Sequence, residues 1–241
     1  MRIATWNLER LPTAWRRSVI QSQLREVNAD IWILTETSSG LSPGKDYKLV
    51  SSGAPDRLGD QGEVWVAIWS RFPIRQIDVF GDPARSAAAS ISLPNSQRLG
   101  VCGTVLPWRG SPWRSYPSAG AVAFSAALEA QKADWHRINA EHDGLCVAGD
   151  FNQDLSAKSY YWSAKARALL SSALAECNLQ AVTADPTDPV RTLTQQERAS
   201  IDHICLPRQW HTSAPPVAWP RFLDGRPMSD HFGVYVDLPD A

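Results

Sequence analysis

Apolar residues along the chain fall into short continuous runs and into longer stretches with helical spacing. Short apolar runs that end at Gly, Pro, Asn or Asp are typical of buried strands. Strands are therefore predicted at 1–7, 31–36, 47–52, 63–70, 74–80, 86–93, 97–106, 145–150, 199–207 and 231–238. Three stretches with apolar residues three or four positions apart predict helices, at 12–30, 118–141 and 158–175.

These elements follow one another without a linker, a low-complexity segment or a sequence repeat, which predicts one domain over residues 1–241. A Pro-rich loop is expected at 207–228, before the last strand. Helices among many strands, several of them hairpin-like, favour an α/β fold. In such a fold two mixed sheets pack face to face with helices outside.

Composition narrows the class of protein only slightly. The chain is 44% hydrophobic and 20% charged, as in ordinary globular proteins that bury a sizeable core. Its formal net charge is -1 and its pI is about 6.5. A generic, strongly basic nucleic-acid binder is disfavoured, although a local basic patch would suffice for such binding.

The four cysteines form no C-x-x-C pair, and three of them lie in apolar, strand-like runs. Structural thiols are therefore predicted, rather than a zinc site or a disulfide. The first strand leaves no room for a leader, and the apolar runs are shorter than a membrane helix. A cytoplasmic monomer without a membrane segment is the default expectation.

Two segments near the start offer oxygen ligands for a metal ion. Asn7 and Glu9 stand two positions apart, so an extended backbone would point both side chains the same way. Glu36 follows a buried strand and suits Mg²⁺, which takes one or two carboxylates. The same residues also fit a simpler interpretation, in which Asn7 and Glu36 end strands at the surface and Glu9 caps a helix.

A second polar pair follows the strand at 145–150. Asp150 and Asn152 belong to a G-D-x-N segment, in which an extended backbone would again place both on one face. A carboxylate there can orient a water, and an amide can donate to charge that grows on a phosphate. A G-D-x-N turn without a catalytic role explains the same letters.

The third group consists of an aspartate and a histidine far apart in the sequence. Asp202 shares a strand face with apolar residues, and a carboxylate in such a place needs a partner. His231, directly after Asp230, is the predicted partner, because an Asp–His pair fixes the imidazole tautomer. His203 is expected to be a packed or surface histidine.

These groups meet only under one condition on the topology. Asn7, Glu36 and Asp150 follow their strands, whereas Asp230 and His231 precede theirs. All five lie at one end of the sheets only if the last strand runs antiparallel to the others. A mixed sheet permits that arrangement.

The chain resembles the endonuclease/exonuclease/phosphatase superfamily in five motifs that occur in the same order. They are W-N-x-E/D at 6–9, a strand ending in Glu at 36, G-D-x-N at 149–152, S-I-D-H-I at 200–204 and S-D-H at 229–231. That superfamily includes abasic-site nucleases, DNase I-like nucleases, sphingomyelinases and inositol-polyphosphate phosphatases. The resemblance implies a four-layer α/β sandwich and a metal-dependent phosphoesterase.

The resemblance also implies roles for individual residues. On the metal side, Glu36 is the main ligand of Mg²⁺ or Mn²⁺, with Asn7 and Glu9 nearby. On the phosphate side, five residues are implied. Asp150 orients or activates the attacking water and Asn152 steadies the transition state, His231 pairs with Asp202 and contacts the scissile phosphate, and Asp230 completes the metal or phosphate environment.

Two positions depart from the family pattern. Abasic-site nucleases carry Asp where this chain has Glu9. They also carry a Tyr in an N-A-Y-V-P segment, and DNase-like members a His, whereas this chain has G-T-V-L-P at 103–107. Neither an abasic-site assignment nor a strict DNase-like mechanism is therefore implied. Trp108 and Arg109 follow directly and are the candidates for substrate contact, because Arg suits phosphate.

Hydrolysis of phosphodiester bonds, with nucleic acid as the first substrate to test, is the leading hypothesis. The 11 Trp residues allow base stacking, and the segment 107–117 interleaves Trp with Arg. A phosphatase or phosphodiesterase for small molecules or phospholipids is the alternative. A catalytically silent binding module is the third hypothesis, and the intact set of site residues argues against it.

Overall fold

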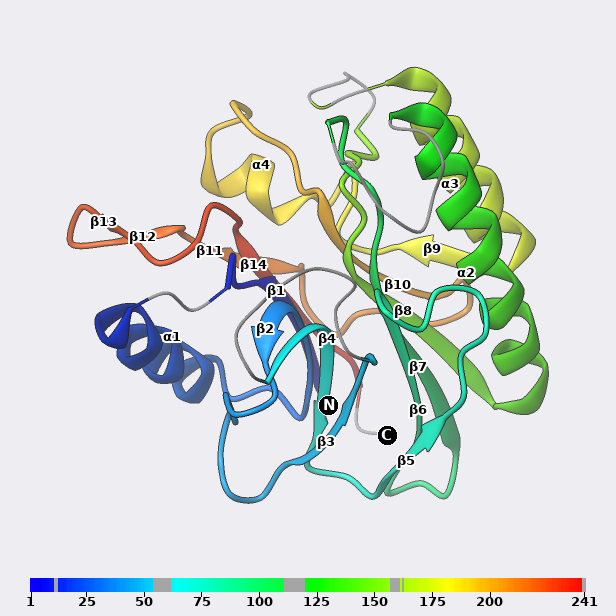
Figure 1. Cartoon of the computed structure of the whole chain (residues 1–241), viewed down its shortest axis with the longest axis horizontal. Helices are drawn as coiled ribbons and strands as arrows, with labels where there is room; N and C mark the ends of the chain where they lie inside the picture. The colour runs from blue at the N-terminus through cyan, green and yellow to red at the C-terminus, as the bar shows by residue number, and fades with distance from the viewer. Residues whose placement is uncertain (11–12, 54–61, 111–119, 157–160, 162, 240–241) are drawn as a thin grey trace.

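Two six-stranded sheets form the centre of the computed structural model (Figure 1). The structure describes residues 1–10, 13–53, 62–110, 120–156, 161 and 163–239. The first sheet has the strand order β11-β14-β1-β2-β4-β3. Its strands are β1 (Arg2–Asn7), β2 (Ile31–Ser38), β3 (Lys48–Ser51), β4 (Glu63–Ser70), β11 (Val217–Trp219) and β14 (Gly233–Asp237).

The second sheet has the order β5-β6-β7-β8-β10-β9. Its strands are β5 (Ile74–Ile77), β6 (Ser86–Ser92), β7 (Arg98–Val105), β8 (Gly144–Asp150), β9 (Leu179–Ala181) and β10 (Asp202–Pro207). Each sheet contains one parallel pair, β1 with β2 and β7 with β8, among antiparallel neighbours. Both sheets are therefore mixed, as predicted.

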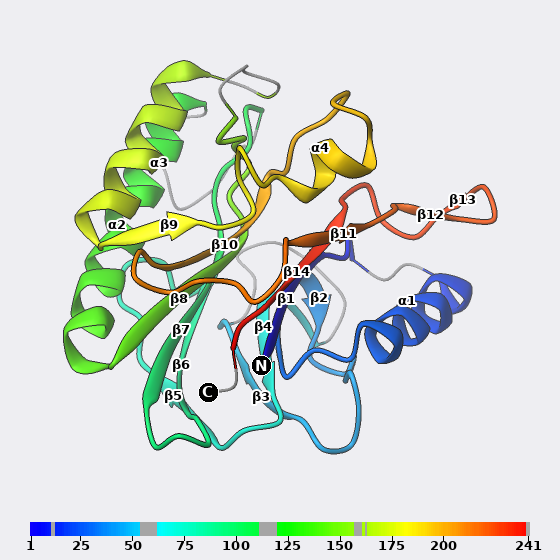
Figure 2. The same cartoon turned by 180° about the vertical axis from the view of Figure 1, so that it is seen from behind.

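Helices cover the outer faces of both sheets, which gives four layers (Figures 1 and 2). Helix α1 (Ala14–Val27) packs its buried residues on the first sheet. Helices α2 (Ala121–Glu141) and α3 (Ala164–Glu176) pack on the second sheet and on each other. The short helix α4 (Pro189–Leu193) and the hairpin of β12 (Phe222–Leu223) and β13 (Arg226–Pro227) lie outside the layers.

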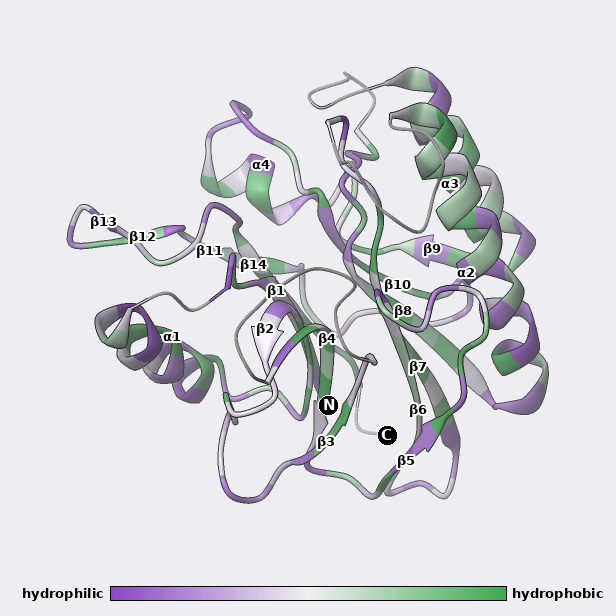
Figure 3. Ribbon diagram, in the orientation of Figure 1, coloured by the Kyte–Doolittle hydropathy of each residue, from purple (hydrophilic) through white to green (hydrophobic). Residues whose placement is uncertain are grey.

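The main core lies between the sheets and continues under α2 and α3, and a second core lies between the first sheet and α1. The strands at the centre are mostly hydrophobic, whereas much of α1 is hydrophilic (Figure 3). Close contact between the sheets needs a glycine. A Cβ added at Gly103 on β7 would lie 2.3 Å from Val66 Cγ1 and 3.1 Å from Ile33 Cγ2 on the facing sheet.

The predicted strands and helices are present, with ends that differ by a few residues. The structure adds β9 and α4, and it places β11, β12 and β13 within the expected loop 207–228. The helix predicted at 158–175 begins at Ala164, where Ser163 caps it, and the one predicted at 12–30 ends at Val27. No helix in the described part of the chain has the length and apolar character needed to cross a membrane.

The topology brings the predicted site residues to one end of the sheets, because the last strand is antiparallel to its neighbour β1. Strand β14 is antiparallel to β1 and pairs Val234 with Thr5, which brings the segment before β14 to the end of β1. In the second sheet β10 is antiparallel to β8, and its first residue, Asp202, pairs with the last residue of β8, Asp150. The carboxyl ends of β1 and β8 and the amino ends of β10 and β14 thus meet.

Candidate active site

Asn7, the last residue of β1, links the two sheets at this end of the molecule. Its Nδ2 donates to Asp150 Oδ2 at 3.0 Å and to Glu36 Oε1 at 3.3 Å. Only 1% of the residue is exposed. Because β2 lies parallel beside β1, with Asn7 opposite Thr35, Glu36 is one step further along the same edge. The structure therefore brings together three residues predicted from separate motifs.

Glu36 has a backbone conformation that non-glycine residues seldom adopt, with φ of 44°. Such strain at a functional site is held by its surroundings. Here the Glu36 carbonyl accepts a hydrogen bond from Arg10 N at 2.9 Å, and its carboxylate lies 3.6 Å from Arg10 Nε. Burial raises the pKa of Glu36, and the hydrogen bond from Asn7 opposes that effect.

Glu9 does not share a direction with Asn7 through an extended backbone, contrary to the sequence-based expectation. Strand β1 ends at Asn7, and Glu9 has a φ of 46°. The Glu9 amide donates to Asn7 Oδ1 at 2.8 Å, so the chain turns around the asparagine side chain. The Glu9 carboxylate is 47% exposed and lies 3.3 Å from Arg16 Nη2.

Asp150 and Asn152 meet in a tight turn rather than on one extended face. Gly149 has a φ of 136°, and a Cβ there would lie 2.2 Å from Thr104 O, so glycine is required. Asn152 has a φ of 47°. Its backbone N donates to Asp150 Oδ1 at 2.9 Å, and its Nδ2 donates to Asp150 Oδ2 at 2.8 Å and to Leu106 O at 3.0 Å.

The carboxyl of Asp150 has a strongly shifted proton affinity. Burial raises its pKa, as do the nearby carboxylates of Asp202 and Glu36, while His231 and the Asn152 amide lower it. The result is a pKa of about 8. Buried acids whose pKa approaches neutrality cluster at catalytic sites.

Asp202 and His231 form the predicted pair. His231 Nδ1 lies 2.6 Å from Asp202 Oδ2, which leaves Nε2 as the other ring atom for the site. Burial lowers the pKa of His231, but the charges of Asp202 and Asp150 outweigh burial and raise that pKa to about 10. The imidazolium form is therefore the main form at neutral pH.

The segment before β14 fixes the place of the histidine. Ser229 Oγ donates to Asn7 O at 2.7 Å and accepts from His231 N at 3.0 Å. Trp6 Nε1 donates to His231 O at 3.2 Å. The side chain of Asp230 is 58% exposed, and its Oδ1 lies 3.8 Å from His231 Nε2. Sequence reasoning did not single out Ser229, although it is the first letter of the S-D-H motif.

A cavity of about 460 Å³ opens over these groups. Trp108, Tyr161, Arg198, Arg221 and Phe232 contribute to its lining together with the acidic residues and His231. Trp108 is 49% exposed, as suits a residue at a rim. The predicted substrate residue Arg109 is exposed and is not among the described residues that line the cavity. The two lining arginines follow no motif, so sequence reasoning missed them.

The donor set fits a hard divalent cation. Asp150 and Asp202 offer carboxylate oxygens to a metal ion, and these atoms lie within 4.8 Å of one another and of a ring nitrogen of His231, which is not a ligand in its imidazolium form. Asp202 Oδ1 is buried and has no hydrogen-bond partner among the residues that the structure describes. The Glu36 carboxylate lies close by, because Asn7 Nδ2 donates to both Glu36 and Asp150. Oxygen ligands of this kind suit Mg²⁺ and Mn²⁺.

His203 was expected to be either packed or at the surface, and the structure shows that it is packed. It is fully buried, with Nε2 at 3.1 Å from Gln153 O and Nδ1 at 3.3 Å from Thr183 Oγ1. Burial lowers the pKa of His203, which favours the neutral ring. The four cysteines are buried free thiols, as predicted.

Comparison with known proteins shows the family and the fold of the chain. The model of the Endonuclease/Exonuclease/phosphatase family matches residues 4–231. A mannosyl-6-phosphatase of Bacteroides thetaiotaomicron superposes with a TM-score of 0.71 at 16% identity, over 99% of each chain. A 3' phosphatase of Neisseria bound to a product DNA hairpin has a TM-score of 0.69 at 17% identity, again over 99% of each chain.

An AP endonuclease of Archaeoglobus fulgidus has the same fold, with a TM-score of 0.67 at 16% identity over 99% of each chain. No curated protein matches the sequence. Likeness at such low identity shows the fold, while the family model shows the family. The chain belongs to the endonuclease/exonuclease/phosphatase family of hydrolytic phosphoesterases.

Proposed function

We propose that this protein hydrolyses phosphodiester bonds with the help of a divalent metal ion, and that nucleic acid is its substrate. The observation that carries the proposal is the placement of Asp150. This buried carboxyl receives hydrogen bonds from Asn7 and Asn152 and lies beside the Asp202–His231 pair, at the base of the cavity.

Each residue has a part in the proposed reaction. Glu36 and Asn7 would hold Mg²⁺ or Mn²⁺, which supplies Lewis-acid stabilisation of the charge on phosphate. Glu9 adjoins this metal side through its amide, which donates to Asn7 Oδ1, while its carboxylate lies 3.3 Å from Arg16 Nη2. Asp150 accepts a proton from the attacking water as a carboxylate, a form that positive charge beside Glu36 favours.

On the phosphate side, His231 donates from Nε2 to a phosphate oxygen as an imidazolium, and Asp202 keeps the ring charged and oriented. Asp230 borders the same ring atom. Both amide hydrogens of Asn152 go to Asp150 and Leu106, which supports a role in orienting the base rather than direct contact with phosphate.

The lining of the cavity supports a nucleic-acid substrate. Trp108, Tyr161 and Phe232 offer aromatic faces on which bases stack, and Arg198 and Arg221 suit phosphate. The volume of about 460 Å³ also accommodates a small phosphate ester, which keeps a small-molecule phosphatase as the second candidate. A monomer remains our expectation.

A panel of three substrates tests the proposal. Bis-p-nitrophenyl phosphate, p-nitrophenyl phosphate and plasmid DNA are incubated with the protein and Mg²⁺ or Mn²⁺, with Asp150→Asn as the control variant. We expect cleavage of the diester and of DNA by the wild-type protein and none above background by the variant. Hydrolysis of the monoester alone would favour the small-molecule phosphatase, and inertness toward all three would contradict the proposal.

A further inference from the structure

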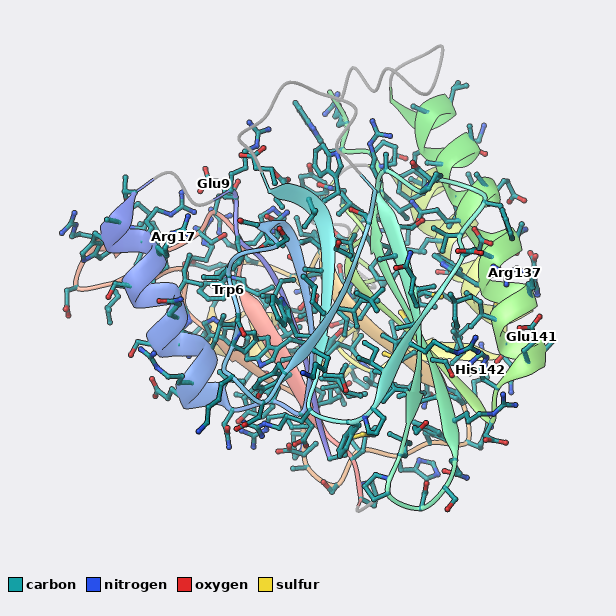
Figure 4. The ribbon with its side chains drawn as sticks, turned by 60° about the horizontal axis from the view of Figure 1, so that its bottom comes forward. Trp6, Glu9, Arg17, Arg137, Glu141 and His142 are labelled. Atoms are coloured by element: carbon teal, nitrogen blue, oxygen red, sulfur yellow. The ribbon has the colours of Figure 1, made fainter. Side chains whose placement is uncertain are left out.

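Arg16 stands outside the motifs that define the site, yet it contacts the motif at 6–9 and the residue directly before the motif at 229–231. It belongs to the first turn of α1, where its backbone N donates to the capping Thr13 Oγ1 at 3.2 Å. Its side chain runs back toward the sheet and is only 11% exposed. The neighbouring Arg17, on the same helix, is exposed (Figure 4).

The guanidinium of Arg16 joins two chain segments that lie near opposite ends of the sequence. Nη2 donates to Leu8 O at 2.8 Å, and Nε donates to Met228 O at 2.9 Å. Glu9 Oε2 lies 3.3 Å from Nη2 and adds a charge partner at the outer side. Leu8 and Met228 are both buried, at 0% and 2% exposure, so their carbonyls meet little water.

Each of these carbonyls is next to a residue of the site. Leu8 directly follows Asn7 on the metal side, and Met228 directly precedes Ser229, whose hydroxyl holds both Asn7 and His231. A planar guanidinium can hold two carbonyls in a fixed relation because its donors form a rigid fork. Two ties, one through Ser229 and one through Arg16, therefore join the end of β1 to the loop before β14.

We propose that Arg16 is a positioning residue, which sets the separation between the metal side of the site at Asn7 and the phosphate side at His231. The inference rests on the function proposed above. Arg16 is not among the described residues that line the cavity, so it acts through the backbone of the two segments and not by contact with substrate. Displacements of about 1 Å in such a constellation lower turnover roughly 100-fold.

The test compares three variants with the wild-type protein. Arg16→Met removes both hydrogen bonds but keeps an apolar stem. Arg16→Lys keeps the charge opposite Glu9, but an ammonium lacks the planar fork. Arg17→Met removes a charge from the same helix and is the matched control. For each we would measure kcat and KM on bis-p-nitrophenyl phosphate, thermal unfolding, and amide exchange of peptides that cover residues 8–10 and 228–232.

We expect Arg16→Met to lose about ten-fold or more in kcat, and Arg16→Lys about five-fold, with KM within about three-fold of wild type. Exchange in both peptides should be faster in Arg16→Met, and Arg17→Met should match wild type. A kcat within two-fold of wild type for either Arg16 variant would overturn the proposal. Failure of both variants to fold would overturn it as well, since Arg16 would then serve folding alone.

The experiment separates a failure of the proposed function from a failure of the role proposed for Arg16. If the wild-type protein hydrolyses no phosphate ester, the function is wrong, and the exchange data still test the tie. Faster exchange of the 228–232 peptide in Arg16→Met, against unchanged exchange in Arg17→Met, would support the tie. Unchanged exchange in Arg16→Met would overturn it.

Discussion

Among single residues, Asp202 and His231 are coupled most directly, through a contact of 2.6 Å between charged groups. Groups that act as a unit give losses that do not add. We expect Asp202→Asn and His231→Ala each to lose about 100-fold or more in kcat/KM. The double variant should be little worse than His231→Ala alone. Losses that multiply in this double-mutant cycle would show independent roles.

The same pair predicts a pH dependence. Activity that needs the His231 imidazolium is full below the pKa of that residue and is lost as the pH rises through it, and Asp202 helps to raise that pKa to about 10. In Asp202→Asn we expect the alkaline loss of kcat at lower pH than in wild type. A pH profile whose alkaline side does not move would remove Asp202 from this role.

Arg109 is the substrate residue that the sequence indicated, one position after the rim residue Trp108. Because Arg109 is nearer in the sequence to the end of β7 than Arg114 is, we expect Arg109→Ala to weaken turnover more than Arg114→Ala. Arg114 lies outside the residues that the structure describes. Equal kinetics of the two variants would exclude Arg109 and leave Arg198 and Arg221 as the phosphate-binding candidates.

At the scale of elements, the segment from α4 to β10 forms one wall of the cavity. Hydrogen bonds to Asp188 join the start of this segment to Ser200 near its end. This buried carboxylate caps α4 through Val190 N at 2.9 Å and accepts from Ser200 N and Ser200 Oγ, both at 2.9 Å. Loss of a buried hydrogen-bond partner costs about 1–3 kcal/mol, and loss of a helix N-cap costs about 1 kcal/mol. We expect Asp188→Ala to destabilise the protein by roughly 2–3 kcal/mol in urea unfolding.

The exposed Glu197 in the same segment provides the control, because Glu197→Ala should leave stability within about 0.5 kcal/mol of wild type. Asp188→Ala should also raise KM for phosphate esters, since Arg198 and Ser200 line the cavity. Equal stability of the two variants would show that the cap does not hold this wall.

The sequence predicted long buried elements well, because runs such as 63–70 and 145–150 leave little choice but a buried strand. It missed α4 and β9, which have five and three residues and carry no periodicity that such lengths can display. The predicted direction of the Glu9 side chain was wrong. The left-handed turn at Glu9 depends on a hydrogen bond from its amide to the Asn7 side chain, which the sequence pattern does not display. In the sequence, Arg16 has the pattern of an ordinary helix arginine. Its two hydrogen bonds depend on the fold, which brings Met228 beside Leu8.

For the molecule as a whole, an ion pair joins the first strand to the last. Arg2 Nε and Nη2 donate to Asp237 Oδ1 and Oδ2 at 2.8 and 2.9 Å, and the hydrogen bond from Arg2 lowers the pKa of Asp237. A lowered pKa in the folded state adds stability above the pKa of the unfolded carboxyl. That contribution is lost as the pH falls through the folded value.

We therefore expect Asp237→Asn to be less stable than wild type at neutral pH by about 1 kcal/mol or less, the scale of partly exposed pairs. The difference should disappear in strongly acidic solution. Urea unfolding at several pH values measures it, with the exposed Asp224→Asn as the control. A difference that persists unchanged at low pH would show that the charge of Asp237 is not its cause.

In the proposed function, Glu36 would hold the divalent cation with which the site hydrolyses phosphodiesters. The most direct measurement is the rate of bis-p-nitrophenyl phosphate hydrolysis during a Mg²⁺ titration that follows EDTA treatment, for wild type and Glu36→Gln. We predict no turnover in EDTA, recovery with Mg²⁺ in the wild type, and almost none in Glu36→Gln, whose thermal unfolding should resemble wild type. Full turnover in excess EDTA, or by Glu36→Gln, would contradict the account.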